Sequence, residues 1–274
     1  MLVILTGAKS INNNPDAGVL ATDPLLSWQD LGLPFKDKPK LLRPISIGRT
    51  NRSYLVEASG RLYVLRINAP NSHILGIDRQ REKTLVELAS KYGIGPQVHF
   101  CSIEHGVLLT EFIEGRHWQP GDLKDPEKLD LLTRSMEVLH SLPVTPLKFQ
   151  YRLHAEHYWE QLLSHKPEQA NTLSGARDRV LGILDETPAR TCICHHDPIP
   201  ANIVESAGKL FFLDWEYAAP GWSAFDYAAI SVEWCVELED LKLPAYISVE
   251  ECLKAKELYC YLCRLWEHLQ GNQS

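Results

Sequence analysis

The chain has 274 residues, 45% of them hydrophobic and 23% charged, which is enough for one large domain or two lobes with a full core. Its formal net charge of -7 at pH 7 argues against nucleic acid or an anionic membrane as a partner, and it suits a cationic substrate. The seven cysteines are scattered mostly through apolar runs, which favours free thiols over a disulfide framework. The N-terminal apolar run is short and lacks a preceding basic region, and no other run is long enough to span a membrane, so we expect a cytoplasmic protein.

The start of the chain is predicted to carry no function. Residues 1–24 mix polar residues with Asn, Pro and Gly, which is typical of a poorly ordered extension or a first loose strand. Residues 25–33 then predict a short amphipathic helix that is stopped by Pro34.

Residues 25–113 are predicted to form a small N-lobe built on an antiparallel sheet. Alternating apolar residues on either side of the turns at Gly48, Ser59-Gly60 and His105-Gly106 predict its strands. One helix interrupts them over residues 76–92, where the apolar positions follow a helical period.

Residues 114–274 are predicted to form a larger, mainly helical C-lobe. Apolar periodicity predicts helices over 129–140, 155–164 and 176–184, with further helices beyond Phe225. The fold class is therefore α+β with two lobes, joined near Gly115 where the sheet gives way to helices.

The stretch CHHDPIPANIVESAGKLFFLDWEY, residues 194–217, concentrates the chemistry of the chain. His195, Asp197 and Asn202 follow the pattern H-x-D-x-x-x-x-N, in which a carboxylate accepts a hydroxyl proton and an amide holds a metal ion. Asp214 ends an apolar strand, and a tight turn at Ser206-Ala207-Gly208 brings it back beside Asn202. A carboxylate and an amide oxygen form a hard-oxygen set that suits Mg2+, so this stretch predicts a phosphoryl-transfer centre.

The N-lobe supplies a predicted nucleotide site. The turn at Gly48 can lay backbone N–H groups over phosphates, with Thr50 and Asn51 adding side-chain hydrogen bonds. Arg66 ends an apolar strand, where it can clamp phosphates, and Glu82 on the following helix is available to pair with it. Pairing of Glu82 with the arginines of its own helix is the alternative.

Two alternatives from other classes compete with an enzyme. A zinc-binding module is suggested by a cluster of cysteine and histidine residues, namely Cys192, Cys194, His195 and His196, and by the Cys260/Cys263 pair. The cluster lacks ordinary zinc-finger spacing, and the pair lies in a helical run. A nucleotide-binding regulator without activity would be expected to lack Asp197, Asn202 or Asp214, and all three are present.

From about Leu42 to its C-terminus, the sequence resembles the choline kinase and aminoglycoside phosphotransferase superfamily. The motifs IGRTNRSYLV, YVLRI, IDRQREKTLVELASKYGIGP, HHDPIPANI and FLDWEYAAPGWSAFDYA agree in order, and choline and ethanolamine kinases look most similar. The resemblance implies a protein-kinase-like fold and the cofactors ATP and Mg2+. A protein kinase itself is disfavoured, because no A-P-E signature follows Asp214.

The resemblance also implies roles for individual residues. Asp197 would be the catalytic base, with His195 in the same catalytic motif, and Asn202 and Asp214 would bind Mg2+. Arg66 would contact ATP phosphates and be oriented by Glu82, while the backbone from Glu111 to Ile113 would receive adenine. Asp226 is predicted to have a structural role.

The acceptor is predicted to be a small cationic alcohol. A quaternary ammonium donates no hydrogen bond, so its site needs aromatic faces and a carboxylate. The resemblance places Glu216, Tyr217, Glu233 and Trp266 in this site. It also places Cys263 where choline kinases commonly carry a second Trp, so choline is the first expectation, with thiamine as the main rival, followed by ethanolamine and aminoglycosides.

Overall fold

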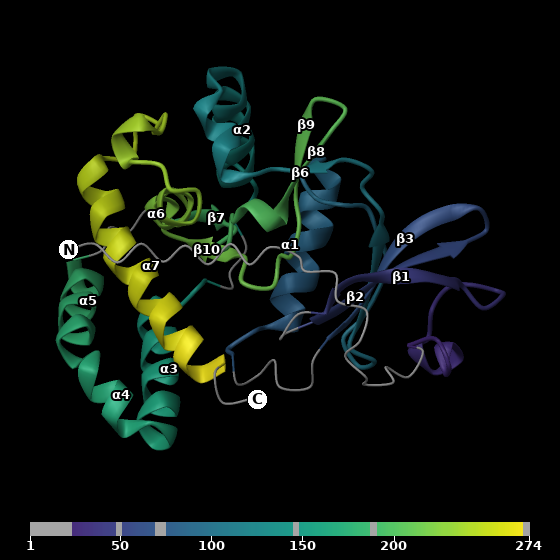
Figure 1. The fold of residues 1–274 in the computed structure, drawn as a ribbon, viewed down its shortest axis with the longest axis horizontal. Coiled ribbons are helices and arrows are strands. Elements are labelled where there is room, and N and C mark those ends of the chain that lie inside the picture. Colours follow the sequence, from purple (N-terminus) through teal and green to yellow (C-terminus); the bar gives the residue numbers. More distant parts are fainter. Residues whose placement is uncertain (1–23, 48–50, 69–74, 145–147, 187–190, 271–274) are drawn as a thin grey trace.

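The computed structural model describes residues 24–47, 51–68, 75–144, 148–186 and 191–270. Gly48 and Thr50, and all but the last residue of the predicted extension, lie outside these ranges. Figure 1 shows two lobes, a sheet on one side and a group of helices on the other. We call them the sheet lobe (β1–β5 and α1) and the helical lobe (α2–α7 and the short strands β6–β10).

Five antiparallel strands form the sheet in the order β1-β2-β3-β5-β4. Their bounds are Lys40–Ile47, Asn51–Ala58, Arg61–Asn68, Val98–Ser102 and Val107–Glu111 for β1 to β5. The β2–β3 hairpin turns at Ser59 and Gly60, which both have positive φ, as a two-residue hairpin loop with the twist of its strands requires. Before the sheet, the predicted helix over 25–33 is wrong: only the 3-10 turn Trp28–Leu31 forms, and Gly32 ends it in the left-handed region.

Helix α1, Arg79–Lys91, begins at Asp78, whose carboxylate accepts hydrogen bonds from two backbone N–H groups of the first turn. One face of the helix buries Leu85, Val86 and Ala89, and the helix lies between the sheet and the helical lobe (Figure 1). Because α1 contacts both β4 and β10, its first turn stands at the junction of the two lobes.

The helical lobe packs around α7. Its helices are α2 Pro126–His140, α3 Tyr151–His165, α4 Pro167–Thr172, α5 Ser174–Glu186, α6 Ser223–Glu233 and α7 Val249–Gln270. Helix α7 packs against α3, α5 and α6, and its 22 residues bury a continuous apolar stripe that includes Ala255, Leu258 and Leu265. No helix in the described ranges combines the length and apolar character that a membrane crossing needs.

Short strands shape the edge of the helical lobe that faces the sheet. β7 Cys192–Cys194 pairs with β10 Ala219–Gly221, and β8 Ile203–Ser206 pairs with both β6 Arg116–His117 and β9 Lys209–Phe212. The predicted turn joins β8 and β9, with Ala207 and Gly208 both at positive φ. The α+β fold of two lobes is confirmed, and the short helix α4 is an element that the periodicity did not predict.

Candidate active site

The segment that carries the H-x-D motif leaves β7 and is fixed by a buried carboxylate. Asp226 on α6 is fully buried and accepts hydrogen bonds from the backbone N–H groups of His195 (3.0 Å) and His196 (2.8 Å) and from His140 Nε2 (2.9 Å). Burial acts to raise the pKa of Asp226, but the bond and charge of His140 outweigh it, so the pKa lies below its ordinary value. A charged Asp226 therefore holds the chain just before Asp197 in one conformation.

Asp197 is held from both sides of its turn. Asn202 Nδ2 donates to the Asp197 carboxylate at 2.9 Å and to its backbone carbonyl at 3.0 Å, and Trp234 donates its indole N–H to the carbonyl of Pro198 at 2.8 Å. Burial, and then the negative charge of Glu233, raises the pKa of Asp197 to about 7. That value is well placed for a general base near neutral pH.

The β8–β9 hairpin brings Asp214 beside this turn. The backbone N–H of Leu213 donates to the carbonyl of Asn202 at 2.8 Å, so the two ends of the hairpin are tied together. Asp214 has φ 58°, a left-handed backbone conformation that an Asp tolerates better than most residues. This conformation still costs conformational free energy, and such residues are often found at functional sites. Burial and the nearby Glu216 raise the pKa of Asp214 well above its ordinary value, while Arg66 opposes this shift.

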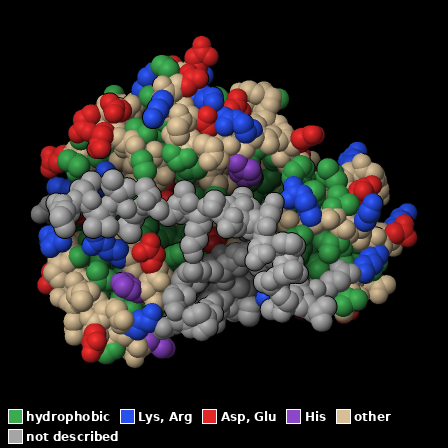
Figure 2. All heavy atoms as spheres, in the orientation of Figure 1, with side chains coloured by type: hydrophobic (Ala, Val, Ile, Leu, Met, Phe, Trp, Pro, Cys, Tyr) green, Lys and Arg blue, Asp and Glu red, His purple; other side chains and the backbone are tan. Residues whose placement is uncertain are grey.

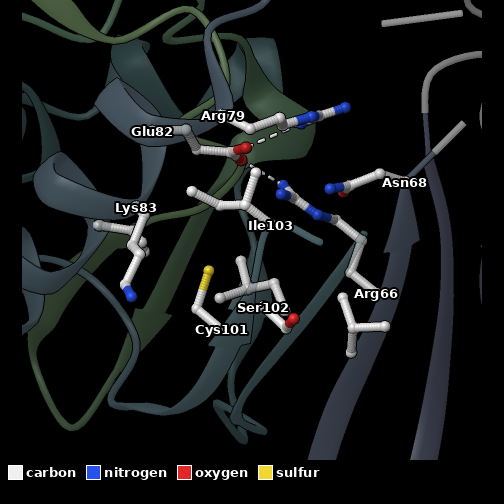
Figure 3. A pocket seen from close by; sticks show the side chains of 11 residues that line it. Arg66, Asn68, Arg79, Glu82, Lys83, Cys101, Ser102 and Ile103 are labelled. Atoms are coloured by element: carbon white, nitrogen blue, oxygen red, sulfur yellow. Dashed lines mark hydrogen bonds and ion pairs between the residues drawn. The ribbon is translucent and has the colours of Figure 1, made fainter. Parts of the chain in front are cut away.

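Arg66 reaches from β3 towards two carboxylates. Its Nη1 lies 2.5 Å from Glu82 Oε1 and 3.3 Å from Asp214 Oδ1. Arg79 contacts the other oxygen of Glu82 at 2.8 Å, and Figure 3 shows both arginines converging on this carboxylate. Both predicted modes of pairing by Glu82 are thus present, with Arg66 and with an arginine of its own helix.

A second part of the same network links the lobes. Glu216 Oε2 accepts a hydrogen bond from Asn51 Nδ2 at 2.8 Å and lies 3.2 Å from Arg79 Nη1, while Arg79 Nη2 donates to Asn51 Oδ1 at 3.0 Å. Glu216 was predicted to face the acceptor. It lines the acceptor-side cavity described below, but its carboxylate is engaged by the sheet lobe.

A cavity of about 730 Å³ lies between the lobes on the sheet side, and we call it the nucleotide-side cavity. Its walls include Asn51, Arg66 and the segment from Glu111 to Ile113, together with apolar residues of both lobes such as Val64 on β3 and Val204 on β8. The described residues predicted to contact ATP therefore surround one space, apart from Glu82, which stands behind Arg66.

A second cavity of about 400 Å³, the acceptor-side cavity, opens in the helical lobe. Six aromatic residues from α3, α6, α7 and the segments before α3 and β10 line it: Phe149, Tyr158, Tyr217, Phe225, Tyr259 and Trp266. Asn202 and Asp214 line both cavities, and Asp197 lines the acceptor-side cavity. The two spaces thus meet at the predicted metal ligands.

The acceptor-side cavity is suited to positive charge. Its lining includes the carboxylates of Asp197, Glu216, Glu233 and Glu267, and no Lys or Arg lines it among the residues that the structure describes. Burial lowers the pKa of His154 to about 3 and that of His196 to about 4, so both rings are neutral at pH 7. Glu233 accepts a hydrogen bond from the Tyr259 hydroxyl at 2.8 Å, which fixes its carboxylate in the wall.

Three other predicted residues have different surroundings. His195 is fully buried, and its Nε2 is bonded to the carbonyl of Leu213 at 2.9 Å, which places it behind the site. Trp266 is half-buried, and Cys263 stands one helical turn before it in the same wall. The cysteine therefore leaves space where a larger side chain would fill the cavity.

Sequence reasoning did not single out Arg79, His154, Tyr158 or Tyr259. His154 and Tyr158 lie four residues apart and point from one face of α3, so their spacing is a usable signal. The same spacing is also the ordinary pattern of a helix that packs on a core, which α3 does with Ala155 and Leu162.

The fold and these two cavities have the architecture of a small-molecule kinase. The model of the choline/ethanolamine kinase family matches residues 42–266, so the chain belongs to this family. It is 26% identical over 219 residues to the protein LicA of Haemophilus influenzae, a match that covers 78% of this chain and 61% of LicA. It is 24% identical to ethanolamine kinase 2 of Mus musculus, over 65% of this chain and 49% of that protein.

A solved structure supports the protein-kinase-like fold expected from the motifs. The choline kinase LicA from Streptococcus pneumoniae superposes with a TM-score of 0.73 at 24% identity, covering 85% of this chain and 87% of that one. The curated relatives described above are longer, since the chain spans about half to three fifths of their length.

Proposed function

We propose that the protein is an ATP- and Mg2+-dependent kinase that phosphorylates the hydroxyl of a small cationic amino alcohol, with choline first. The observation that carries this proposal is the pair of cavities that meet at Asn202 and Asp214. The nucleotide-side cavity is lined by Arg66, whose guanidinium group is well suited to phosphate. The acceptor-side cavity is lined by aromatic rings and carboxylates. A quaternary ammonium is attracted by such faces and needs no hydrogen-bond acceptor.

The donor set at the meeting point fits Mg2+. The amide nitrogen of Asn202 donates a hydrogen bond to Asp197, so the side-chain oxygen of Asn202 is the atom that can bind a cation. The Asp214 side chain is 37% exposed, so its carboxylate is accessible to the same cation. A divalent cation would also offset the repulsion between Asp214 and Glu216. Bound there with the nucleotide, Mg2+ would neutralise the charge of the phosphates.

Asp197 is proposed to act as the general base. Asn202 occupies one oxygen of its carboxylate at 2.9 Å, which orients the other towards an acceptor hydroxyl in the adjoining cavity. Proton transfer to Asp197 would increase the nucleophilicity of that hydroxyl as it attacks the terminal phosphate. His195, bonded to the Leu213 carbonyl, would act by positioning the end of β9 rather than by touching substrate.

The sheet lobe is proposed to bind the nucleotide, with Glu111 to Ile113 against the adenine and Arg66, oriented by Glu82, on the phosphates. We retain residues 25–113 and 114–274 as the proposed extents of the two lobes, and the cytoplasm as the proposed compartment.

Thiamine is the second candidate acceptor, because Cys263 leaves room for a ring in the acceptor-side cavity. Ethanolamine and aminoglycosides follow. A nucleotide-binding regulator without activity is the alternative outside enzymes, and the presence of Asp197, Asn202 and Asp214 together disfavours it.

A screen of ATP consumption tests the proposal directly. The purified chain is offered choline, ethanolamine, thiamine and an aminoglycoside, each with and without Mg2+, and the phosphorylated product is identified by mass spectrometry. We expect turnover that requires Mg2+ and is highest with choline. Turnover of none of the four, with Mg-ATP binding intact, would favour the regulator.

A further inference from the structure

Beneath the catalytic segment, the fold collects three side chains that are typical ligands of soft metal ions. His140 is the last residue of α2, and Cys192 and Cys194 alternate along β7, so that both cysteines project from the same face of the strand. One ligand atom from each of the three residues lies within 4.8 Å of the others. All three residues are buried, and the two sulfurs are 3.7 Å apart.

The two ring nitrogens of the histidine in this cluster have different surroundings. Its Nε2 is bonded to Asp226 at 2.9 Å, and its Nδ1 is buried and has no hydrogen-bond partner in the part of the chain that the structure describes. A buried polar atom without a partner is unusual in a folded protein and calls for an explanation. Metal-bound histidines almost always give their second ring nitrogen to a carboxylate or carbonyl, which is what His140 does with Asp226.

We propose that His140, Cys192 and Cys194 form a structural Zn2+ site in the core of the helical lobe. The spacing of the sulfurs supports this, because two thiolates about 2.3 Å from a tetrahedral ion lie roughly 3.8 Å apart. The Ser223 hydroxyl is hydrogen-bonded to Cys192, so one further polar group lies beside the three ligands.

The charge of the ligands selects the ion. Two thiolates and a neutral imidazole balance the charge of Zn2+, whereas a monovalent soft ion would leave an uncompensated negative charge in a buried site beside Asp226. Mg2+ is excluded because it takes oxygen ligands. Binding releases the two thiol protons and the Nδ1 proton that His140 carries when it is charged, and it forms two Zn–S bonds and one Zn–N bond with no change of oxidation state.

The metal would stabilise the fold of the helical lobe, and this role does not depend on the proposed reaction. It joins the end of α2 to β7 and, through Asp226, to α6, directly below the backbone that presents Asp197. The zinc ligands considered from the sequence included His195 and His196. In the structure His140 takes their place beside the two cysteines. His195 is hydrogen-bonded to the Leu213 carbonyl, and His196 is hydrogen-bonded to the Tyr151 hydroxyl at 2.7 Å.

Titration of the reduced, chelator-treated full chain with Co2+ and then Zn2+ tests the site. We expect one equivalent of Co2+ to produce the thiolate-to-cobalt charge-transfer band of a tetrahedral site, and Zn2+ to displace it and raise the melting temperature. The double variant Cys192→Ser/Cys194→Ser should lose the band. The matched control Cys235→Ser/Cys260→Ser removes two thiols outside the cluster and should keep it. His140→Gln, whose amide can still donate to Asp226, should weaken Co2+ affinity by tenfold or more.

A second readout needs no variant. Alkylation of the wild-type chain in mild denaturant, with and without Zn2+, followed by peptide mapping, should show that the metal protects Cys192 and Cys194 selectively. The proposal is overturned if the reduced wild-type chain gives no charge-transfer band, or if Zn2+ protects other cysteines, such as Cys260 and Cys263, instead.

Discussion

At the scale of single residues, the role of Asp197 makes the sharpest prediction. Asp197→Asn should leave Mg-ATP binding nearly unchanged while lowering kcat by roughly 10²–10⁴-fold, the usual contribution of general-base catalysis. The amide keeps the size of the side chain and remains within reach of Asn202. Calorimetric ATP affinity and steady-state kcat, measured on the same preparation, check both parts; an unchanged kcat would remove Asp197 from the mechanism.

The pKa of the same residue predicts a pH profile. A carboxyl with a pKa of about 7 is mostly protonated below that pH and cannot accept a proton, so kcat/KM should fall tenfold per pH unit on the acid side of about 7. A profile that stays flat down to pH 5 would contradict this assignment.

Glu233 tests whether the acceptor-side cavity recognises a cation. Glu233→Gln removes the charge at nearly constant shape and keeps an oxygen for Tyr259, so KM for the cationic acceptor should rise while KM for ATP stays near that of the wild type. The negative charge of Glu233 is the second cause, after burial, of the raised pKa of Asp197. The acid limb of the kcat/KM profile should therefore also move to lower pH in this variant. Glu250→Gln, at an exposed position outside both cavities, is the matched control; equal effects from both variants would reject the cation site.

At the scale of elements, Gly115 shows how closely the crossing between the lobes is packed. A Cβ at this position would collide with the backbone carbonyl of Glu205 and lie 2.7 Å from the Val204 side chain, both on β8. Gly115→Ala should therefore lower the free energy of unfolding by about 1–3 kcal/mol, the usual cost of overpacking. Gly121→Ala is the control, because a Cβ there meets nothing within 4 Å, and denaturant melts of the two variants should differ accordingly.

The elements also show how far the sequence could be interpreted. The β8–β9 hairpin was predictable because Ser206-Ala207-Gly208 is a local turn signal, and this hairpin brings Asn202 and Asp214 together. The position of Arg79 in the site was not predictable, because an arginine in the first turn of a helix is usually exposed. Its partner Glu216 lies 137 residues further along the chain.

The walls of the acceptor-side cavity were only partly predictable for the same reason. Tyr217 and Trp266 stand in motifs, whereas Phe149 and Tyr158 acquire a role only when α3 packs against α7. The cluster of His140 with two cysteines joins α2 to β7, a contact that no local pattern encodes.

At the scale of the whole molecule, Asp214 is the residue through which the proposed binding of Mg-ATP would connect the two lobes. Asp214→Ala removes a carboxylate that faces both cavities and also Arg66, so Mg-ATP affinity should fall together with the rate. In the wild type, saturation to 100 times Kd stabilises the fold by about 2.7 kcal/mol, and the variant should show a smaller rise in melting temperature at the same concentration. An unchanged thermal shift would mean that the metal binds elsewhere.

The meeting of the two cavities at Asn202 and Asp214 has a stereochemical consequence. The acceptor hydroxyl would approach the phosphorus from one cavity while the departing nucleotide withdraws into the other, and no residue between them is needed to carry the phosphoryl group. A single in-line displacement inverts the configuration at phosphorus. ATP made chiral at its γ-phosphorus with oxygen isotopes should therefore yield a phosphorylated alcohol of opposite handedness, and retention would reveal a covalent phosphoenzyme and two successive displacements.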